Sequence, residues 1–337
     1  MSRHRWALAC SAVAVLAFLA CDDEHRRTAP GQVFGGGRCE ALPGQLPAPD
    51  CDSSERACSA GQSCTIAASC GATATCLPLA DNTGRDVLDL RIRRLNIASP
   101  AVLAGAFIQS TVVNGNLDLA APQCAESGTG LFSWILRLDM RMNLLTTGGA
   151  PPALDPFGKG FCFADLTIGA TKISPITTRI ERSGNTFRTL EQRDVNIPIY
   201  STPDPASALI LPISAARIEG ATLSADGNCI GRFNPAALDS ACTEDRALCS
   251  KWATGGALGG FITLENAEKV TIRELGNRSI CAYLAAESTP TCARDASGRI
   301  TFRGDYCSVD HAAGSCADSV WLAATFAASA VTIGSCE

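Results

Sequence analysis

Cysteine content is the feature that most constrains what this chain can fold into. Eighteen of its 337 residues are cysteine. Cys10 and Cys21 lie in or directly after an apolar leader, and setting them aside leaves sixteen, an even number. An even set of cysteines in an exported chain predicts a disulfide framework rather than free thiols. The disulfide candidates are Cys39, Cys51, Cys58, Cys64, Cys70, Cys76, Cys124, Cys162, Cys229, Cys242, Cys249, Cys281, Cys292, Cys307, Cys316 and Cys336.

The six cysteines from Cys39 to Cys76 lie in one segment of mostly small and polar residues. From Cys58 onward they recur every six residues, in CSAGQSCTIAASCGATATC. Because this segment offers little hydrophobic core, crosslinks must hold it, each contributing about 2–4 kcal/mol. Structural zinc is the competing use, but zinc sites favour cysteines roughly two to four residues apart. The segment therefore predicts a disulfide module over residues 39–80, with its connectivity left open and without a metal.

The other ten cysteines are spread over the remainder of the chain, from Cys124 onward. Cysteines that are close in sequence can close local loops, so proximity predicts some of their pairings. A single catalytic cysteine is the alternative use, and the even count disfavours it. The predicted local pairs are Cys242 with Cys249, Cys281 with Cys292, and Cys307 with Cys316.

Residues 1–20 have the form of a secretory signal peptide. MSRHR is a short positive segment, and Trp6 to Ala20 are apolar but too few to span a bilayer comfortably. The composition then changes at once, because DDEHRRTAPGQVFGGGR is rich in charge, proline and glycine. That composition predicts a flexible tether over residues 21–38. A plain secretory signal whose Cys21 joins a disulfide, and an uncleaved single-pass anchor, are the two alternatives.

The junction FLAC resembles the lipobox of bacterial lipoprotein precursors. The resemblance covers residues 1–22 and implies that a diacylglycerol group is attached to Cys21 and that a peptidase cuts between Ala20 and Cys21. Leu19 and Ala20 match the positions before the cut, whereas Phe18 stands where leucine is usual. Two or three acyl chains give stable anchoring. The resemblance therefore implies a lipid-anchored protein of the bacterial cell envelope, with the outer membrane or cell surface favoured over the inner membrane.

Charge and histidine content limit the available chemistry. The formal net charge is −5, and no cluster of lysine or arginine is interleaved with aromatic residues, which excludes a nucleic-acid partner. Of the three histidines, only His311 lies beyond the leader and the tether. A Ser/His/Asp hydrolase would need His311, but Ser308 and Asp310 are its neighbours in sequence and no G-x-S-x-G motif is present. We interpret His311 as an exposed residue of a disulfide-bounded loop.

No other motif identifies a site. Phosphate-binding motifs are absent, and we interpret the glycine-rich GGALGGF at residues 255–261 as a flexible loop. DNTGRD offers Asp81, Asn82 and Asp86 as oxygen ligands, but it misses the calcium-loop pattern and reads as a linker turn. Sequence spacing does not identify a glycosidase pair of carboxylates. The sequence therefore predicts no catalytic, cofactor-binding or metal-binding residue, and no cofactor.

Residues 85–337 have the pattern of an antiparallel β domain. VLDLRIRRLNI alternates apolar and charged residues, as a strand with one buried face does. LFSWILRLDMRMNLL alternates again, and further short runs flank the turn signals at Asn114-Gly115, Ser183-Gly184-Asn185 and Asp226-Gly227. Repeated turn-centred pairs of strands predict a mainly β (α+β) fold, an antiparallel β-sandwich or irregular barrel.

Helix signals gather in one part of this domain. Asn234-Pro235 has the form of an N-cap and first helical residue, and LENAEKVTIRELG ends at Gly276, a candidate C-terminal stop. We predict a small helical insert near residues 234–285, packed on the sheet. The final apolar run, VWLAATFAASAVTI, is predicted to be a strand ending near Cys336.

These features together predict an envelope lipoprotein whose β domain acts as a binding or scaffolding module. Its expected partners are the membrane, contacted through the N-terminal lipid, and an envelope protein or glycan. The alternative is a membrane-anchored extracytoplasmic hydrolase with a site built from carboxylates or His311. A purely structural envelope component is a third interpretation. The scarcity of histidine and the lack of catalytic motifs favour binding or structure over hydrolysis.

Overall fold

The computed structural model describes residues 32–35, 38–47, 76–105, 107–121, 126–204, 207–233 and 252–336. The predicted signal peptide, its cleavage site between Ala20 and Cys21, and Asn234-Pro235 lie outside the described residues. Within the described part of the chain, no helix is long and apolar enough to cross a membrane.

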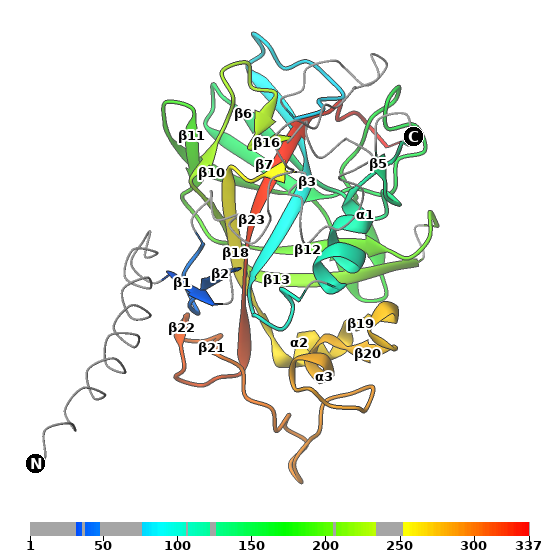
Figure 1. Cartoon of the computed structure of the whole chain (residues 1–337), viewed down its shortest axis with the longest axis vertical. Coiled ribbons are helices and arrows are strands. Elements are labelled where there is room, and N and C mark those ends of the chain that lie inside the picture. The colour runs from blue at the N-terminus through cyan, green and yellow to red at the C-terminus, as the bar shows by residue number, and fades with distance from the viewer. Residues whose placement is uncertain are drawn as a thin grey trace, which may run out of the picture.

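The described chain is mainly β, and 13 strands form one sheet in which every pairing is antiparallel. The long strands β23 and β3 run side by side through the middle of the molecule (Figure 1). Three short strands lie off the main path: β15 (Cys229–Ile230) and β21 (Tyr306–Cys307) pair with β23, and β22 (Ala312–Ala313) pairs with β21. The main order is β12 (Arg193–Tyr200), β13 (Ala208–Glu219), β18 (Gly256–Thr263), β23 (Ser319–Ala330), β3 (Val87–Ser99), β6 (Trp134–Asp139), β7 (Leu144–Gly149), β10 (Ile176–Ser183), β11 (Thr186–Thr189) and β14 (Ala221–Thr222).

Short strand pairs and short helices lie outside this sheet. The two-stranded pairs are β1 (Gln32–Gly35) with β2 (Arg38–Ala41), β4 (Ala120–Ala121) with β5 (Glu126–Ser127), β8 (Leu166–Ile168) with β9 (Thr171–Ile173), β16 (Arg232–Phe233) with β17 (Trp252–Ala253), and β19 (Thr271–Ile272) with β20 (Arg278–Ser279). The helices are the π-helix η3 (Ile108–Asn114), which continues into α1 (Gly115–Leu117), then α2 (Leu264–Lys269), the 3-10 helix η8 (Arg273–Leu275) and α3 (Ile280–Leu284).

The sheet is curled into a half-barrel, because strands that are far apart in its order come into contact. The backbone N–H of Ile218 on β13 donates to the hydroxyl of Thr189 on β11, at 3.1 Å. In the same way β12, at the end of the order, lies against β7, because a Cβ atom at Gly149 on β7 would overlap the ring of Pro198 on β12. The prediction of a mainly β fold built on an irregular antiparallel barrel is therefore confirmed.

The concave face of the half-barrel holds the main hydrophobic core. Leu90 and Ile92 on β3 and Leu136 and Leu138 on β6 are essentially inaccessible to solvent, as is Phe326 on β23. In the sequence they alternate with polar residues, which is the period-two pattern of a strand. The expected single buried face is wrong for β3, however, because Arg91 and Arg93 on its other face are buried as well. The pattern that predicted these strands still identifies their core-facing side.

The predicted hairpin at Asn114-Gly115 is wrong. Residues 108–117 are helical, and both Asn114 and Gly115 have right-handed helical dihedrals instead of the left-handed values that a two-residue hairpin turn needs. Ile108, Val113 and Leu117 are buried in the main core, at the four- to five-residue spacing of one helix face. Tertiary burial of that face outweighs the local turn preference of Asn-Gly.

The interpretation of GGALGGF as a flexible loop is also wrong, because these residues form most of β18, a central strand buried between β13 and β23. The glycines serve close packing here. A Cβ atom at Gly260 would lie 2.6 Å from the carbonyl oxygen of Ser214, and one at Gly259 would lie 2.8 Å from that of Leu322. Glycine lets neighbouring backbones approach at this point.

The helical insert and the C-terminal strand are confirmed where the structure describes them. Helix α2 begins after Thr263, whose hydroxyl accepts a hydrogen bond from the Asn266 N–H at 3.2 Å, an N-cap. Gly276 ends η8 with a φ of 75°, the left-handed value expected of a C-terminal stop. The described helices of this region span only 264–284, since residues 256–263 are strand. The final apolar run forms β23, but the strand ends at Ala330 and not at Cys336 as predicted.

The structure contains four disulfides among the described residues. The predicted pairs Cys281–Cys292 and Cys307–Cys316 are confirmed. The side chains of Cys39, Cys51, Cys58, Cys64, Cys70, Cys124, Cys242 and Cys249, and hence the predicted Cys242–Cys249 pair, lie outside the described residues. The other two disulfides are long-range, Cys162–Cys336 and Cys76–Cys229.

The sequence groups Cys76 with the clustered cysteines of residues 39–80, and the structure pairs it with Cys229 on β15, outside that segment. Cys76 and Leu77 are buried against Trp252, in a small cluster on the sheet. The other end of the segment also contacts the sheet, because the indole of Trp321 donates to the carbonyl of Gln45 at 2.7 Å. Both described ends of residues 39–80 therefore pack against the β domain.

Replacing Gly260 tests the close packing inside β18. We expect Gly260→Ala to lower the free energy of unfolding by about 1–3 kcal/mol, because the new methyl group overlaps the Ser214 carbonyl. Urea denaturation measures the change. Gly105→Ala is the control, since a Cβ there makes only an ordinary 3.4 Å contact with the Val102 carbonyl. Equal midpoints for both variants would contradict this account of the strand.

Candidate functional site

The interior of the half-barrel contains an apolar cavity of about 150 Å³. Strands from both halves of the sheet contribute to its wall, including Leu258 on β18, Ala324 on β23 and Trp134 on β6. Protein interiors seldom contain voids larger than a water molecule. An apolar cavity of about this volume accommodates a benzene-sized molecule.

The cavity lies where the central strand is poor in large side chains. Alternate residues of β23 face the concave core, and Ala324, between the larger Leu322 and Phe326, is the small one among them that lines the cavity. Opposite stand residues of η3, including Ile108 and Val113. The single methyl group of Ala324 leaves space between β23 and these residues of η3. At roughly 24 cal/mol per Å³, an empty cavity of this size costs about 3–4 kcal/mol of stability.

The hydroxyl groups of Thr147 and Thr189 in the wall form hydrogen bonds within the protein. The Trp134 indole N–H donates to the Thr147 hydroxyl at 2.8 Å, and that hydroxyl donates to the Ile135 carbonyl at 3.1 Å. Thr189 exchanges hydrogen bonds with the backbone of Ile218, as described for the curl of the sheet. The residues that line the cavity include no aspartate, glutamate, histidine or cysteine. The wall therefore presents hydrocarbon to any occupant.

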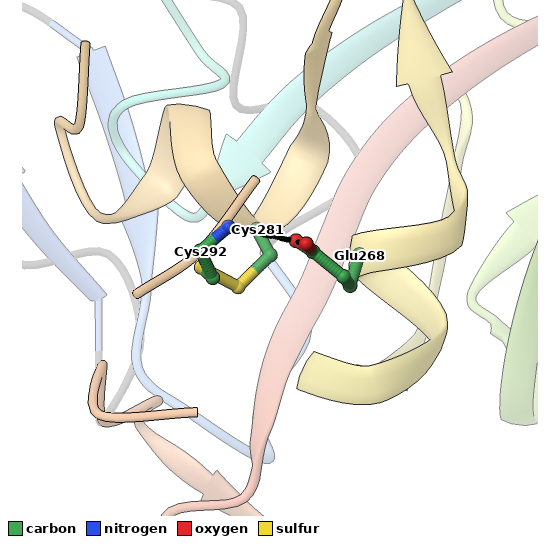
Figure 2. A group of neighbouring side chains, drawn as sticks. All are labelled: Glu268, Cys281 and Cys292. Atoms are coloured by element: carbon green, nitrogen blue, oxygen red, sulfur yellow. Dashed lines mark hydrogen bonds between the residues drawn. A yellow bond between two sulfur atoms is a disulfide. The ribbon is translucent and has the colours of Figure 1, made fainter. Parts of the chain in front are cut away.

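Two segments close the open side of the half-barrel over this cavity. One is η3, and the other is the region of α2 and α3, whose Val270 and Ile280 line the cavity. The second segment is held by a disulfide and a carboxylate (Figure 2). The carboxylate of Glu268 accepts hydrogen bonds from the Cys292 N–H at 3.0 Å and from the Ser279 hydroxyl at 2.7 Å.

The group of Glu268, Cys281 and Cys292 has the composition of a metal site, since its ligand atoms lie within 4.8 Å of one another. Figure 2 shows the carboxylate of Glu268 pointing at the two cysteines, whose sulfurs are bonded to each other. A disulfide sulfur is not the thiolate that zinc requires. The carboxylate oxygens of Glu268 also accept hydrogen bonds. The three residues therefore connect α2 to α3 and have a structural role.

The structure places His311 in the exposed loop closed by Cys307–Cys316, as the sequence predicts. Its ring packs on Phe261, with 5.3 Å between the ring centroids. The hydroxyl of Ser308 donates to Asp318 at 2.7 Å, and Asp310 accepts from Ser315 at 2.8 Å. Ser308 and Asp310 are therefore each engaged with other partners, and no Ser/His/Asp arrangement forms in this loop.

The DNTGRD segment is a hydrogen-bonded turn. Hydrogen bonds from Thr83 and Asn228 lower the pKa of the Asp81 carboxyl, which remains at the surface. The Asn82 amide is buried and donates to the carbonyls of Asp89 and Gly227, at 3.2 and 3.1 Å. These oxygens and nitrogens fix the turn onto the β domain, in agreement with its interpretation as a structural link.

Sequence reasoning missed a pair of buried arginines on β3. Arg91 and Arg93 are 0% exposed, and each guanidinium lies over an aromatic ring, Phe161 for Arg91 and Trp252 for Arg93. Arg91 also donates to the Phe132 carbonyl at 3.1 Å. Burial of charge is costly unless the charge is hydrogen-bonded, so these contacts explain how the sheet tolerates both side chains. The only sequence signal was the RIRR stretch in an alternating strand.

No family model matches this chain, and comparisons with curated proteins and with solved structures found no significant match. Its function is therefore argued from the geometry of the cavity.

A larger side chain on β23 tests whether the cavity is empty space. We expect Ala324→Leu to raise the free energy of unfolding by about 0.5–2 kcal/mol, because the added carbons occupy the cavity. Thermal unfolding measures the effect. The matched control is Ala327→Leu on the same strand, which is 0% exposed and packs with Cys76 and Trp252, and which should lose about 1–3 kcal/mol. A loss of similar size in both variants would show that no space exists at Ala324.

Proposed function

We propose that this chain is an exported, lipid-anchored protein of the bacterial envelope that binds a small ligand inside its half-barrel. The leader and the FLAC junction support anchoring through Cys21. The four disulfides of the described residues fit an oxidising, extracytoplasmic compartment. The outer membrane or cell surface is the favoured location, and an envelope protein or glycan remains a proposed partner.

The cavity is the observation that carries the binding function. It is a concave apolar site inside a folded scaffold, which is where proteins bind small molecules. Each buried methylene contributes about 0.8 kcal/mol, so an occupant of roughly six carbons would gain about 5 kcal/mol, a sub-millimolar Kd. The alternative hydrolase has no support in this site, because its lining residues include neither a carboxylate nor His311.

Replacement of the proposed lipidation residue tests the anchor. We expect Cys21→Ser to abolish incorporation of labelled palmitate and to leave the protein either unprocessed or soluble, because the acyl chains would have no thiol to join. Cys10→Ser, within the apolar leader, is the matched control and should leave labelling unchanged. Labelling of the Cys21→Ser protein at the level of the unsubstituted chain would overturn the proposed anchor.

Xenon tests the proposed binding site without assuming the identity of the ligand. Apolar cavities of this size take up xenon. We expect dissolved xenon to shift the methyl NMR signals of Leu258 and Ile213, which line the cavity, in a saturable way. Ala324→Leu should abolish the shifts, and Leu154→Ala, at a side chain that is 95% exposed and does not line the cavity, should leave them intact. Absence of saturable shifts in the unsubstituted protein would refute binding in the half-barrel.

A further inference from the structure

The chemistry of the ligand follows from the polar groups in the cavity wall. Among about thirty lining residues, those with a polar side chain other than tryptophan are Ser99, Thr147, Thr178, Thr189, Arg193 and Arg217. A polar ligand would lose its bonds to water on entry, and it binds only where the wall offers replacements. The question is therefore which of these six groups is available to a ligand.

The three threonine hydroxyls have partners. Thr147 bonds to the Trp134 indole and to the Ile135 carbonyl, at 2.8 and 3.1 Å. Thr189 bonds to the N–H and the carbonyl of Ile218, at 3.1 and 3.3 Å. Thr178 lies 3.4 Å from the Glu191 carbonyl, a longer contact that still directs its hydroxyl toward the backbone.

The two arginines are held by groups outside the cavity. Arg193 forms an ion pair with Glu191, and about half of its side chain is exposed to solvent, so its charge remains in water. Arg217 donates to the Gly44 carbonyl at 2.8 Å, and its guanidinium lies over the ring of Trp321. The buried Nε of Arg217 makes no hydrogen bond, but it lies 3.2 Å from a carboxylate oxygen of Glu219 in an ion pair. Each positive charge therefore already has a carboxylate partner that is not a lining residue, and no lining residue carries a negative charge.

Ser99 is then the only lining hydroxyl that has no hydrogen bond to a described residue. One hydroxyl cannot replace the several hydrogen bonds that water gives to an ionised carboxylate or ammonium group. The wall therefore favours a hydrocarbon ligand and disfavours the binding of an ionised one.

We infer that the ligand is an uncharged hydrocarbon of about benzene size, a small aromatic ring or short alkyl compound, enclosed without hydrogen bonds. This inference rests on the proposed binding function and adds the ligand class. Shape and the exclusion of water select the ligand, and ionised analogues of equal size are rejected because the wall cannot solvate their charge.

Matched aromatic probes test this ligand class. The protein is the full chain carrying Cys21→Ser, so that no acyl chain competes for the cavity. Toluene, benzoate and benzylammonium share one ring and differ in charge. Saturable methyl NMR shifts of Leu258 and Ile213 report their Kd values. We expect toluene to bind, and both ions to bind at least about tenfold more weakly. Ala324→Leu should weaken toluene binding, and Ser99→Ala should leave it unchanged.

The outcomes separate the two proposals. If xenon binds but benzoate or benzylammonium binds as tightly as toluene, the ligand class is wrong while the binding site stands. Tight binding of benzoate that is lost in Ser99→Ala, with xenon shifts intact, would also overturn the hydrocarbon assignment, because it would show that a hydrogen bond selects the ligand. Hexane and hexanoate extend the comparison to alkyl chains. Equal Kd values for the two would also overturn the assignment to an uncharged hydrocarbon, because the ligand would then be an amphiphile whose charged head group stays outside the cavity. If neither xenon nor any probe binds, the proposed function itself fails.

Discussion

The pairing of β23 with β18 on one edge and β3 on the other is the interaction on which the structure depends. β23 pairs with β18 at eight registered positions without interruption, and with β3 through two shifts of register. Alanine occupies much of β23, and glycine much of β18, so the backbones of neighbouring strands come close at the centre of the sheet. Irregular pairing adds twist and curvature. Small residues at the centre and large ones toward the flanks therefore produce a curled sheet with a hollow interior.

The other face of the sheet is stabilised by different means. Its clusters are small, and they combine aromatic rings with the guanidinium groups of Arg91, Arg93 and Arg217. Cys76–Cys229 adds a covalent link to this face, and Leu46 packs there against the cluster of Trp321. The segment that contains most of the clustered cysteines is thereby joined to the β domain at both of its described ends, by burial at one and by a disulfide at the other.

Sequence patterns predicted those parts of the fold whose structure depends on residues close together in the chain. Alternation identified β3 and β6, and the turn at Gly184, whose φ is +60°, connects β10 to β11 as expected. The predictions were wrong where contacts between residues far apart in the sequence determine the local structure. Asn114-Gly115 is helical because its neighbours bury one helix face, and Cys76 pairs with a residue 153 positions away. The cavity was not predicted at all, because an empty volume is a property of several strands at once and leaves no motif in any of them.

The disulfides also bear on why a cavity can exist here. An empty cavity of about 150 Å³ costs about 3–4 kcal/mol, which is a large part of the stability of an ordinary domain. A single disulfide contributes about 2–4 kcal/mol. Cys281–Cys292 lies in the segment that covers the cavity, where Cys281 is the neighbour of Ile280 in the wall. Crosslinking therefore offsets the cost of the cavity and holds its cover in place, so the wall keeps its shape before a ligand arrives. A preformed apolar site of this kind binds by exclusion of water and needs no polar contact to orient its occupant.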